Sequence, residues 1–299
     1  MKISGFTFVR NGFTFGYPFI QSIQSLLPVV DELIVVVGDS TDGTRQAIEK
    51  LNDKKIIIID SVWNENLRNS GKIFAQQSNL GLEKTTGDWA FHLQVDEVLH
   101  QSSAAKIRQF INLADKNKEV DGLLFPFLHF WGDFNHIHNT RRTHRFEIRA
   151  FKNTGNIFSY KDSQGFRKYA SPQAYINNQP GEKLNIINTS VPVYHYSHSR
   201  NPALMKKKSN YFHRFWHNDQ WLKEKTNEQL FDFNEVDKLE TFSGEHPIYM
   251  KEIIAEKDWD FHYDPSKSNM KMKDKMLNGF EKLFGYRLFE YRNYKIFRY

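Results

Sequence analysis

The stretch VVDELIVVVGDSTDGT, residues 29–44, decides the fold. Residues 33–37 are apolar at every position, which is typical of a central parallel strand covered by helices on both faces. A polar turn follows at residues 39–44, and a short helix is expected at 45–51. Strand, polar turn and helix in this order form the unit of an open α/β sheet.

The rest of the first hundred residues repeats this order. Strands are expected at residues 3–9, 56–60 and 89–95, and helices at 17–27, 71–84 and 102–115. After residue 120 the pattern predicts strands at 123–130, 144–151 and 190–196, then helices at 201–216 and 272–284. Residues 219–269 give only a weak signal.

The expected fold class is therefore α/β, with a mostly parallel open sheet, flanking helices and α+β additions toward the C-terminus. No Pro- or Ser-rich linker marks a domain boundary. We expect one main domain over residues 1–220 and a helical extension over 221–299 that packs on it.

The composition excludes several classes of protein. The 299 residues include no cysteine, which rules out disulfides, Cys-ligated zinc, iron–sulfur clusters and thiol nucleophiles. The longest aliphatic run, residues 33–37, is far shorter than the ~20 residues of a membrane helix. The first residues lack the apolar stretch of a signal peptide, so we expect a cytoplasmic protein. A net charge of +6 fits nucleic acid, an anionic membrane or a phosphorylated ligand equally well.

The main signal for a site is the pair Asp96-Glu97, directly after a predicted apolar strand. Ligands bind at the carboxyl ends of the strands in open α/β sheets. Carboxylate oxygens there are suitable ligands for Mg²⁺ or Mn²⁺, ions that often bridge to a diphosphate. The same pair is also typical of a solvated turn or a helix N-cap, so by itself it assigns no site.

Several motifs in a fixed order are more specific than this pair. They are Arg10-Asn11, Ser40-Thr-Asp-Gly-Thr44, Asn79-Leu-Gly-Leu-Glu83, Thr86-Gly-Asp-Trp89 and Gln94-Val-Asp96. With them the sequence resembles the family 2 glycosyltransferases, whose A-type fold is Rossmann-like and binds nucleotide-sugars. The resemblance covers residues 1–100 well and thins beyond residue 120.

The resemblance implies an inverting glycosyltransferase that moves a sugar from a nucleotide-diphosphate donor to an acceptor hydroxyl, assisted by Mn²⁺ or Mg²⁺. Asp96 matches the usual metal ligand, and His195 resembles a late histidine that completes the metal shell. The residues expected to bind the donor are Arg10, Asn11, Asp39, Ser40, Asp42, Lys72, Gln94 and Arg167. A carbohydrate or lipid-linked acceptor is expected, in the synthesis of cell-envelope polysaccharide, glycolipid or lipopolysaccharide.

Two positions depart from the family pattern. Val37 stands where the family usually has an aspartate that contacts the nucleobase, and Asp39 is the nearest replacement. Gln94 stands at the first aspartate of the Asp-x-Asp motif. Its amide can bond a ribose or sugar hydroxyl but brings no negative charge for a metal.

The catalytic base must be a carboxylate near the anomeric carbon. We expect Asp162, in the polar turn of residues 162–167, with Glu147 and Asp133 as the alternatives. An aspartate in such a turn also commonly bonds its own backbone. His195 has a structural alternative too, as a half-buried strand histidine bonded to a carbonyl.

Residues 271–299 hold eight Lys or Arg against three Asp or Glu. One interpretation is a helix packed on the protein body with Phe280 and Phe284 facing inward, which is the expectation here. The other is peripheral contact with anionic lipid at the inner face of a membrane. A non-catalytic scaffold that binds nucleotide-sugar or nucleic acid is the alternative to an enzyme.

Overall fold

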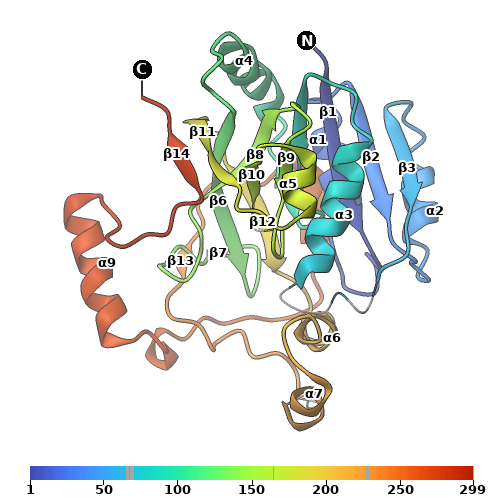
Figure 1. Ribbon diagram of the computed structural model, residues 1–299. Coiled ribbons are helices and arrows are strands. Elements are labelled where there is room, and N and C mark those ends of the chain that lie inside the picture. The colour runs from blue at the N-terminus through green and yellow to red at the C-terminus, as the bar shows by residue number, and fades with distance from the viewer. Residues whose placement is uncertain (65–66, 68–70, 164, 226–228, 299) are drawn as a thin grey trace.

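A twisted sheet forms the centre of the protein (Figure 1). The computed structural model describes residues 1–64, 67, 71–163, 165–225 and 229–298. The strands follow the order β3-β2-β1-β4-β8-β6-β11-β10-β9. The first four run parallel, and they are β3 (Ile56–Asp60), β2 (Glu32–Val37), β1 (Ile3–Val9) and β4 (Trp89–His92).

Helices cover both faces of this parallel part. Leu33, Val35 and Val37 of β2 pack in one apolar cluster with α1 (Phe19–Leu26) and α4 (Ser103–Asp115). Ile34 joins a second cluster with Leu82 of α3 (Lys72–Glu83). All six residues of β2 are buried, as the continuous apolar run predicts. The short α2 (Thr44–Glu49) follows the polar turn.

The sheet changes character after β4. β8 (Phe146–Lys152) pairs antiparallel with β4 and with β6 (Gly122–Trp131). β12 (Val193–His198) runs parallel to β6 and antiparallel to β5 (Glu97–Leu99). The α/β class with α+β additions is therefore confirmed, and the strands beyond β4 pair in both directions, parallel as well as antiparallel.

Several short elements were not predicted from the sequence. They are β7 (His136–Ile137), β9 (Ile157–Ser159), β10 (Phe166–Lys168), α5 (Pro172–Ile176), β11 (Glu182–Asn188), α7 (Asp219–Lys225), β13 (Glu240–Thr241), η2 (Ile248–Met250), α8 (Lys251–Ala255), η3 (Pro265–Lys267) and β14 (Tyr294–Ile296). The strand expected at 89–95 ends at His92, because the chain turns with Glu97 N donating to Gln94 O at 2.9 Å.

The helix α6 (Pro202–His213) lies below the carboxyl ends of the N-terminal strands (Figure 1). Asn201 caps it, because its side-chain oxygen accepts a hydrogen bond from Ala203 N at 2.9 Å. Pro202 occupies the first turn, where its missing N–H costs nothing. This cap fixes where the helix begins and so which of its side chains reach the sheet edge.

The helix α9 (Met272–Phe284) forms as predicted, at the edge of the molecule (Figure 1). The prediction that Phe284 packs inward is wrong, since Phe284 is 66% exposed, whereas Phe280 is half-buried and packs against Phe284 with 4.5 Å between the ring centroids. β14 returns to the sheet beside β11, so the C-terminal segment is tied to it. The boundary expected at residue 220 stays a prediction. None of the described helices combines the length and apolar character needed to cross a bilayer.

Candidate active site

A pocket of about 310 Å³ opens where β1 and β4 end. Its lining combines charged and polar groups with aromatic groups from β1, α3, α6 and the loops that follow β1, β3 and α6. The residues are Phe8, Val9, Arg10, Phe15, Tyr17, Trp63, Phe74, Gln94, Val95, Asp96, Asp162, His195, Ser197, Lys208, Tyr211, Phe212 and Trp216. Five of the residues predicted from the sequence, Arg10, Gln94, Asp96, Asp162 and His195, therefore line one pocket.

Asp96 lies between two basic side chains. Its Oδ1 is 3.6 Å from His195 Nε2 on β12, and its Oδ2 is 3.5 Å from Lys208 Nζ on α6. The backbone of Asp96 is fixed as well, since Tyr196 N donates to its carbonyl oxygen at 2.7 Å. The carboxylate thus joins the sheet edge to the helix below it.

Charge, more than burial, controls the ionisation of Asp96. Burial by itself would raise the pKa of this carboxyl, but the charges of His195, Lys208 and Arg200 hold the pKa well below its usual range. Burial lowers the pKa of the Lys208 ammonium to about 7, and the charge of Arg200 acts in the same direction. Three basic side chains therefore lie around one buried carboxylate.

Hydrogen bonds determine which nitrogens of His129 and His195 carry protons. The carbonyl oxygen of His144 can only accept, so His129 Nε2, 2.7 Å away, carries a hydrogen. Burial holds the pKa of His129 well below its usual range, so the ring is neutral and its Nδ1 accepts. His195 Nδ1, 2.8 Å from that Nδ1, must donate. His195 is thereby oriented with Nε2 toward Asp96.

A second group of polar residues follows β1 and β2. Arg10 donates from Nη2 to Asp39 Oδ2 at 2.8 Å and from Nη1 to the Tyr211 hydroxyl at 2.6 Å. Asn11 N donates to Ser40 Oγ at 2.9 Å. Asp42 accepts from Thr14 N and from Thr44, so it closes the turn before α2. Of these predicted residues Arg10 lines the pocket, whereas Asn11, Asp39, Ser40 and Asp42 are not among the described residues that line it.

Asp162, the expected base, lies where the pocket meets a wider groove of about 1420 Å³. A Cβ atom added to Gly71 would lie 2.6 Å from the Cβ of Asp162. The absence of a side chain at Gly71 therefore allows Asp162 to lie this close to the start of α3. Trp216 borders both spaces, and the groove wall continues along Tyr160, Tyr169 and Tyr175. The turn of residues 162–167 includes Gln164, which lies outside the described residues.

Other predicted residues lie elsewhere. Lys72 lines the wider groove instead of the pocket, and Arg167 donates to the Tyr291 hydroxyl at 3.1 Å. Glu147 lies on β8, and burial raises its pKa to about 8 although the charge of Arg149 opposes this. Asp133 accepts hydrogen bonds from Asn135 N and His136 in a buried turn. Of the three candidate bases, only Asp162 is among the described residues that line the pocket.

The side chains around Asp96 offer few ligands to a divalent cation. Within the described part of the chain, no group of three or more His, Asp or Glu is arranged to hold a metal. One carboxylate oxygen faces His195, while the other faces the Lys208 ammonium. These residues do not fit a cation held by protein groups alone, because Lys208 already supplies the positive charge beside Asp96.

One protein-family model matches about half of the chain. The model of the family described as glycosyl transferase family 2 matches residues 18–172, which include Asp39, Asp96 and Asp162. The chain belongs to glycosyl transferase family 2. No curated protein matches it.

Three solved structures that resemble this family 2 chain are distant in sequence. S. aureus TarS 1-349 is 15% identical with a TM-score of 0.40, over 71% of this chain and 64% of that one. Its complex with UDP-GlcNAc is 15% identical with a TM-score of 0.41, over 71% and 65%. A nucleotidyl transferase from Methanothermobacter thermautotroptrophicus is 14% identical with a TM-score of 0.30, over 51% and 72%. The chain thus spans less than two thirds of the length of the TarS structures.

Sequence reasoning missed the part of the pocket that α6 supplies. Lys208 was visible only as the end of the basic triplet 206–208, and Tyr211, Phe212 and Trp216 as part of a predicted helix. Asp96 and Lys208 are 112 positions apart, so no local spacing connects them. The aromatic spacing at 211, 212 and 216 was the available signal.

Proposed function

We propose that this family 2 chain transfers a sugar from a nucleoside-diphosphate donor to an acceptor hydroxyl. The observation that carries the proposal is the pocket at the ends of β1 and β4, where Asp96, Lys208, Arg10 and Asp162 converge. The cations suit a diphosphate, the aromatic walls suit flat or apolar ligand faces, and Asp162 supplies a carboxylate.

The donor diphosphate would lie beside Lys208 and Arg10. Lys208 Nζ also donates to Ser197 Oγ at 2.8 Å, so its ammonium is already oriented at the pocket wall. Arg10 is held by Asp39 and Tyr211 and presents a planar guanidinium. Asp39, Asn11 and Ser40 would contact the nucleoside, and Gln94 would bond a ribose or sugar hydroxyl.

The chemical step is a single displacement at the anomeric carbon. The acceptor oxygen forms a bond to that carbon while its proton passes to the Asp162 carboxylate. The nucleoside diphosphate leaves with the electron pair of the broken bond, and its charge is stabilised by Lys208 and Arg10. Attack opposite to the leaving group inverts the anomeric configuration.

A role for Mn²⁺ or Mg²⁺ is kept as the alternative way to neutralise the leaving group. Asp96 and His195 are the protein groups that would contribute ligands to it. A cation bound there would polarise the diphosphate oxygens. Chelation by EDTA separates the two proposals, because transfer that depends on Lys208 alone persists and metal-assisted transfer stops.

The wider groove is the proposed place for a carbohydrate acceptor. It meets the pocket at Asp162 and Trp216, so a hydroxyl in it would reach the proposed base. Its tyrosines offer ring faces for sugar C–H groups, and its Asn and Gln side chains offer hydrogen bonds to hydroxyls. A glycan of the cell envelope, free or lipid-linked and built at the cytoplasmic face of a membrane, is the proposed acceptor class.

The test is calorimetric binding of UDP-, GDP-, CMP- and dTDP-sugars to the wild type and to Lys208→Met, with and without EDTA. One donor should bind to the wild type and lose roughly ten- to hundredfold in affinity in Lys208→Met, the range of a charged hydrogen bond. Lys207→Met, an exposed neighbour on the same helix, is the matched control and should bind normally.

Two results would contradict the proposal in different ways. Binding that is unaffected in Lys208→Met would remove Lys208 from the diphosphate site. Binding without sugar transfer, with any acceptor glycan offered, would favour the alternative of a non-catalytic nucleotide-sugar scaffold.

A further inference from the structure

The helix α9 has its polar face toward the protein and its apolar face toward solvent. At about 100° per residue, Met272, Met276 and Leu283 fall within roughly 40° of one another, and Glu281 falls on the other side. These three apolar side chains are 73%, 72% and 80% exposed. An amphipathic helix usually buries its apolar stripe against its own protein, and this one does the reverse.

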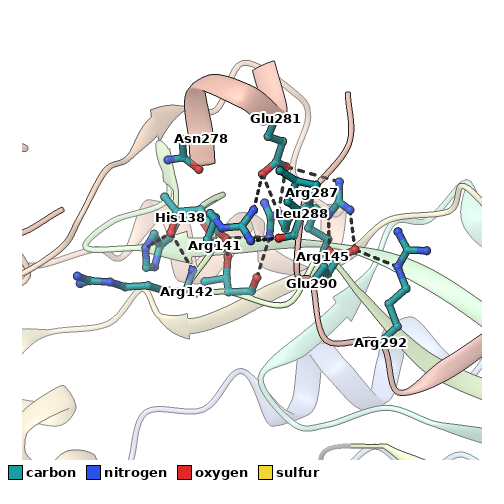
Figure 2. Close-up of polar contacts among 12 residues, drawn as sticks. His138, Arg141, Arg142, Arg145, Asn278, Glu281, Arg287, Leu288, Glu290 and Arg292 are labelled. Carbon is teal, nitrogen blue, oxygen red and sulfur yellow. Dashed lines mark hydrogen bonds and ion pairs between the residues drawn. The ribbon is translucent and has the colours of Figure 1, made fainter. Parts of the chain in front are cut away.

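Arginines from the body hold the inner face of α9 (Figure 2). Glu281 forms ion pairs with Arg287 at 2.9 Å, Arg145 at 3.6 Å and Arg141 at 3.8 Å. Arg287 is only 4% exposed and donates from Nη1 to the carbonyl oxygens of Thr140 and Thr143. These buried contacts fix the rotation of the helix about its axis.

The segments on either side of α9 are held as well. Before the helix, Arg142 donates to the side chain and the backbone of Asn269. After it, Arg145 makes a two-pronged pair with Glu290, with both distances 2.8 Å (Figure 2). The contacts of Arg141, Arg142 and Arg145 therefore hold the polar side of α9 against the protein body. The apolar side of the helix faces solvent for this reason, and not because the helix is detached.

The exposed surface is apolar along its centre and basic at its flanks. Phe284 and Phe289 extend the apolar part and are 66% and 87% exposed. The exposed basic residues of the helix and its start are Lys271, Lys273, Lys275 and Lys282. The acidic Glu281 is neutralised on the opposite face. We define the stripe as Met272, Met276, Leu283, Phe284 and Phe289.

We propose that this stripe binds the headgroup region of an anionic lipid membrane. Apolar side chains flanked by lysines match both parts of such a surface, the acyl boundary and the negative headgroups. A second copy of the chain is a less suitable partner for the stripe. Two stripes packed together would bring the lysines of both copies close to one another, and like charges repel. The inference concerns membrane binding and does not depend on sugar transfer.

The experiment is co-sedimentation of the full chain with vesicles of phosphatidylcholine, with and without phosphatidylglycerol. The wild type should bind the anionic vesicles and be released by high salt. Leu283→Ser/Phe284→Ser should lose about tenfold or more of this binding, since each removes a large apolar group. Lys275→Glu/Lys282→Glu should also lose it.

Controls separate this result from misfolding and from donor binding. Leu113→Ser on α4 removes a 49% exposed leucine elsewhere and should leave vesicle binding unchanged. Circular dichroism and donor affinity of the stripe variants should equal the wild type, because these side chains support neither the core nor the pocket.

Two outcomes would overturn the inference. One is wild-type protein that stays in solution with anionic vesicles, or stripe variants that sediment as well as the wild type. The other is a dimer that the stripe variants convert to a monomer in light scattering, since the stripe would then be a contact between copies of the chain. If the stripe variants lose vesicle binding but keep donor binding, the result supports the inference, whatever the outcome for sugar transfer.

Discussion

Glu97 and Arg149 form the most buried ion pair described near the pocket, with 1% and 3% of their side chains exposed. Arg149 donates from Nε and Nη2 to the two carboxylate oxygens at 2.7 and 2.6 Å. This bidentate geometry uses both oxygens of Glu97. Of the adjacent acids Asp96 and Glu97, one is therefore structural and the other faces the ligand pocket.

Glu147 carries a pH dependence of stability. Burial raises its pKa to about 8 in the folded chain, from the 4.5 of a solvent-exposed glutamate. At a pH between these two pKa values, Glu147 is therefore protonated in the folded state and ionised in the unfolded state. The contribution to stability is full below about pH 4.5 and is lost as the pH rises through about 8.

We predict that Glu147→Gln becomes more stable than the wild type as the pH rises across this window. The glutamine keeps the shape and never ionises, so the gap in melting temperature should widen by roughly 2–4 °C for each kcal/mol. Thermal melts at a series of pH values measure this, with the exposed Glu182→Gln as control. A gap that stays constant with pH would show that Glu147 titrates normally.

At the scale of elements, the start of α3 shapes the candidate active site. Gly71 has φ +66 and lies directly before Lys72, where a Cβ would approach Asp162 to 2.6 Å. The residue thus combines a left-handed backbone with a close contact to the proposed base. The helix begins here because only glycine meets both conditions.

We predict that Gly71→Ala lowers stability by about 1–2 kcal/mol, the cost of a left-handed alanine, and also lowers the transfer rate by displacing Asp162. Gly285→Ala is the matched control, since Gly285 has the same φ of +66 and open space around it. Chemical unfolding and a transfer assay measure the two effects. Equal rates in the two variants would show that Asp162 is not displaced, or is not the base.

The elements that sequence reasoning predicted are those with long, regular patterns. The continuous apolar run of β2 and the helical spacing of α9 gave correct elements. The strands β9, β10 and β14 have three residues each, too few for a period to be visible. The orientation of α9 could not be predicted, because it depends on Arg141 and Arg145, which lie far from it in the sequence.

At the scale of the molecule, the sequence located the half of the site that the parallel strands carry. Asp96 and Arg10 follow strand ends, and the carboxyl ends of parallel strands share one edge. Lys208 and the aromatic wall come from α6, whose docking depends on tertiary packing. The helix α9, which carries the proposed lipid-binding stripe, lies at the edge of the molecule (Figure 1).

The most direct test of the central claim is nucleotide release from a panel of nucleotide-sugars by the wild type and by Asp96→Asn. The account predicts that the wild type releases nucleoside diphosphate from one donor. It predicts at least a tenfold slower release by Asp96→Asn, since the charge that orients Lys208 and His195 is lost. Release at the wild-type rate by Asp96→Asn, or no release from any donor by the wild type, would contradict it.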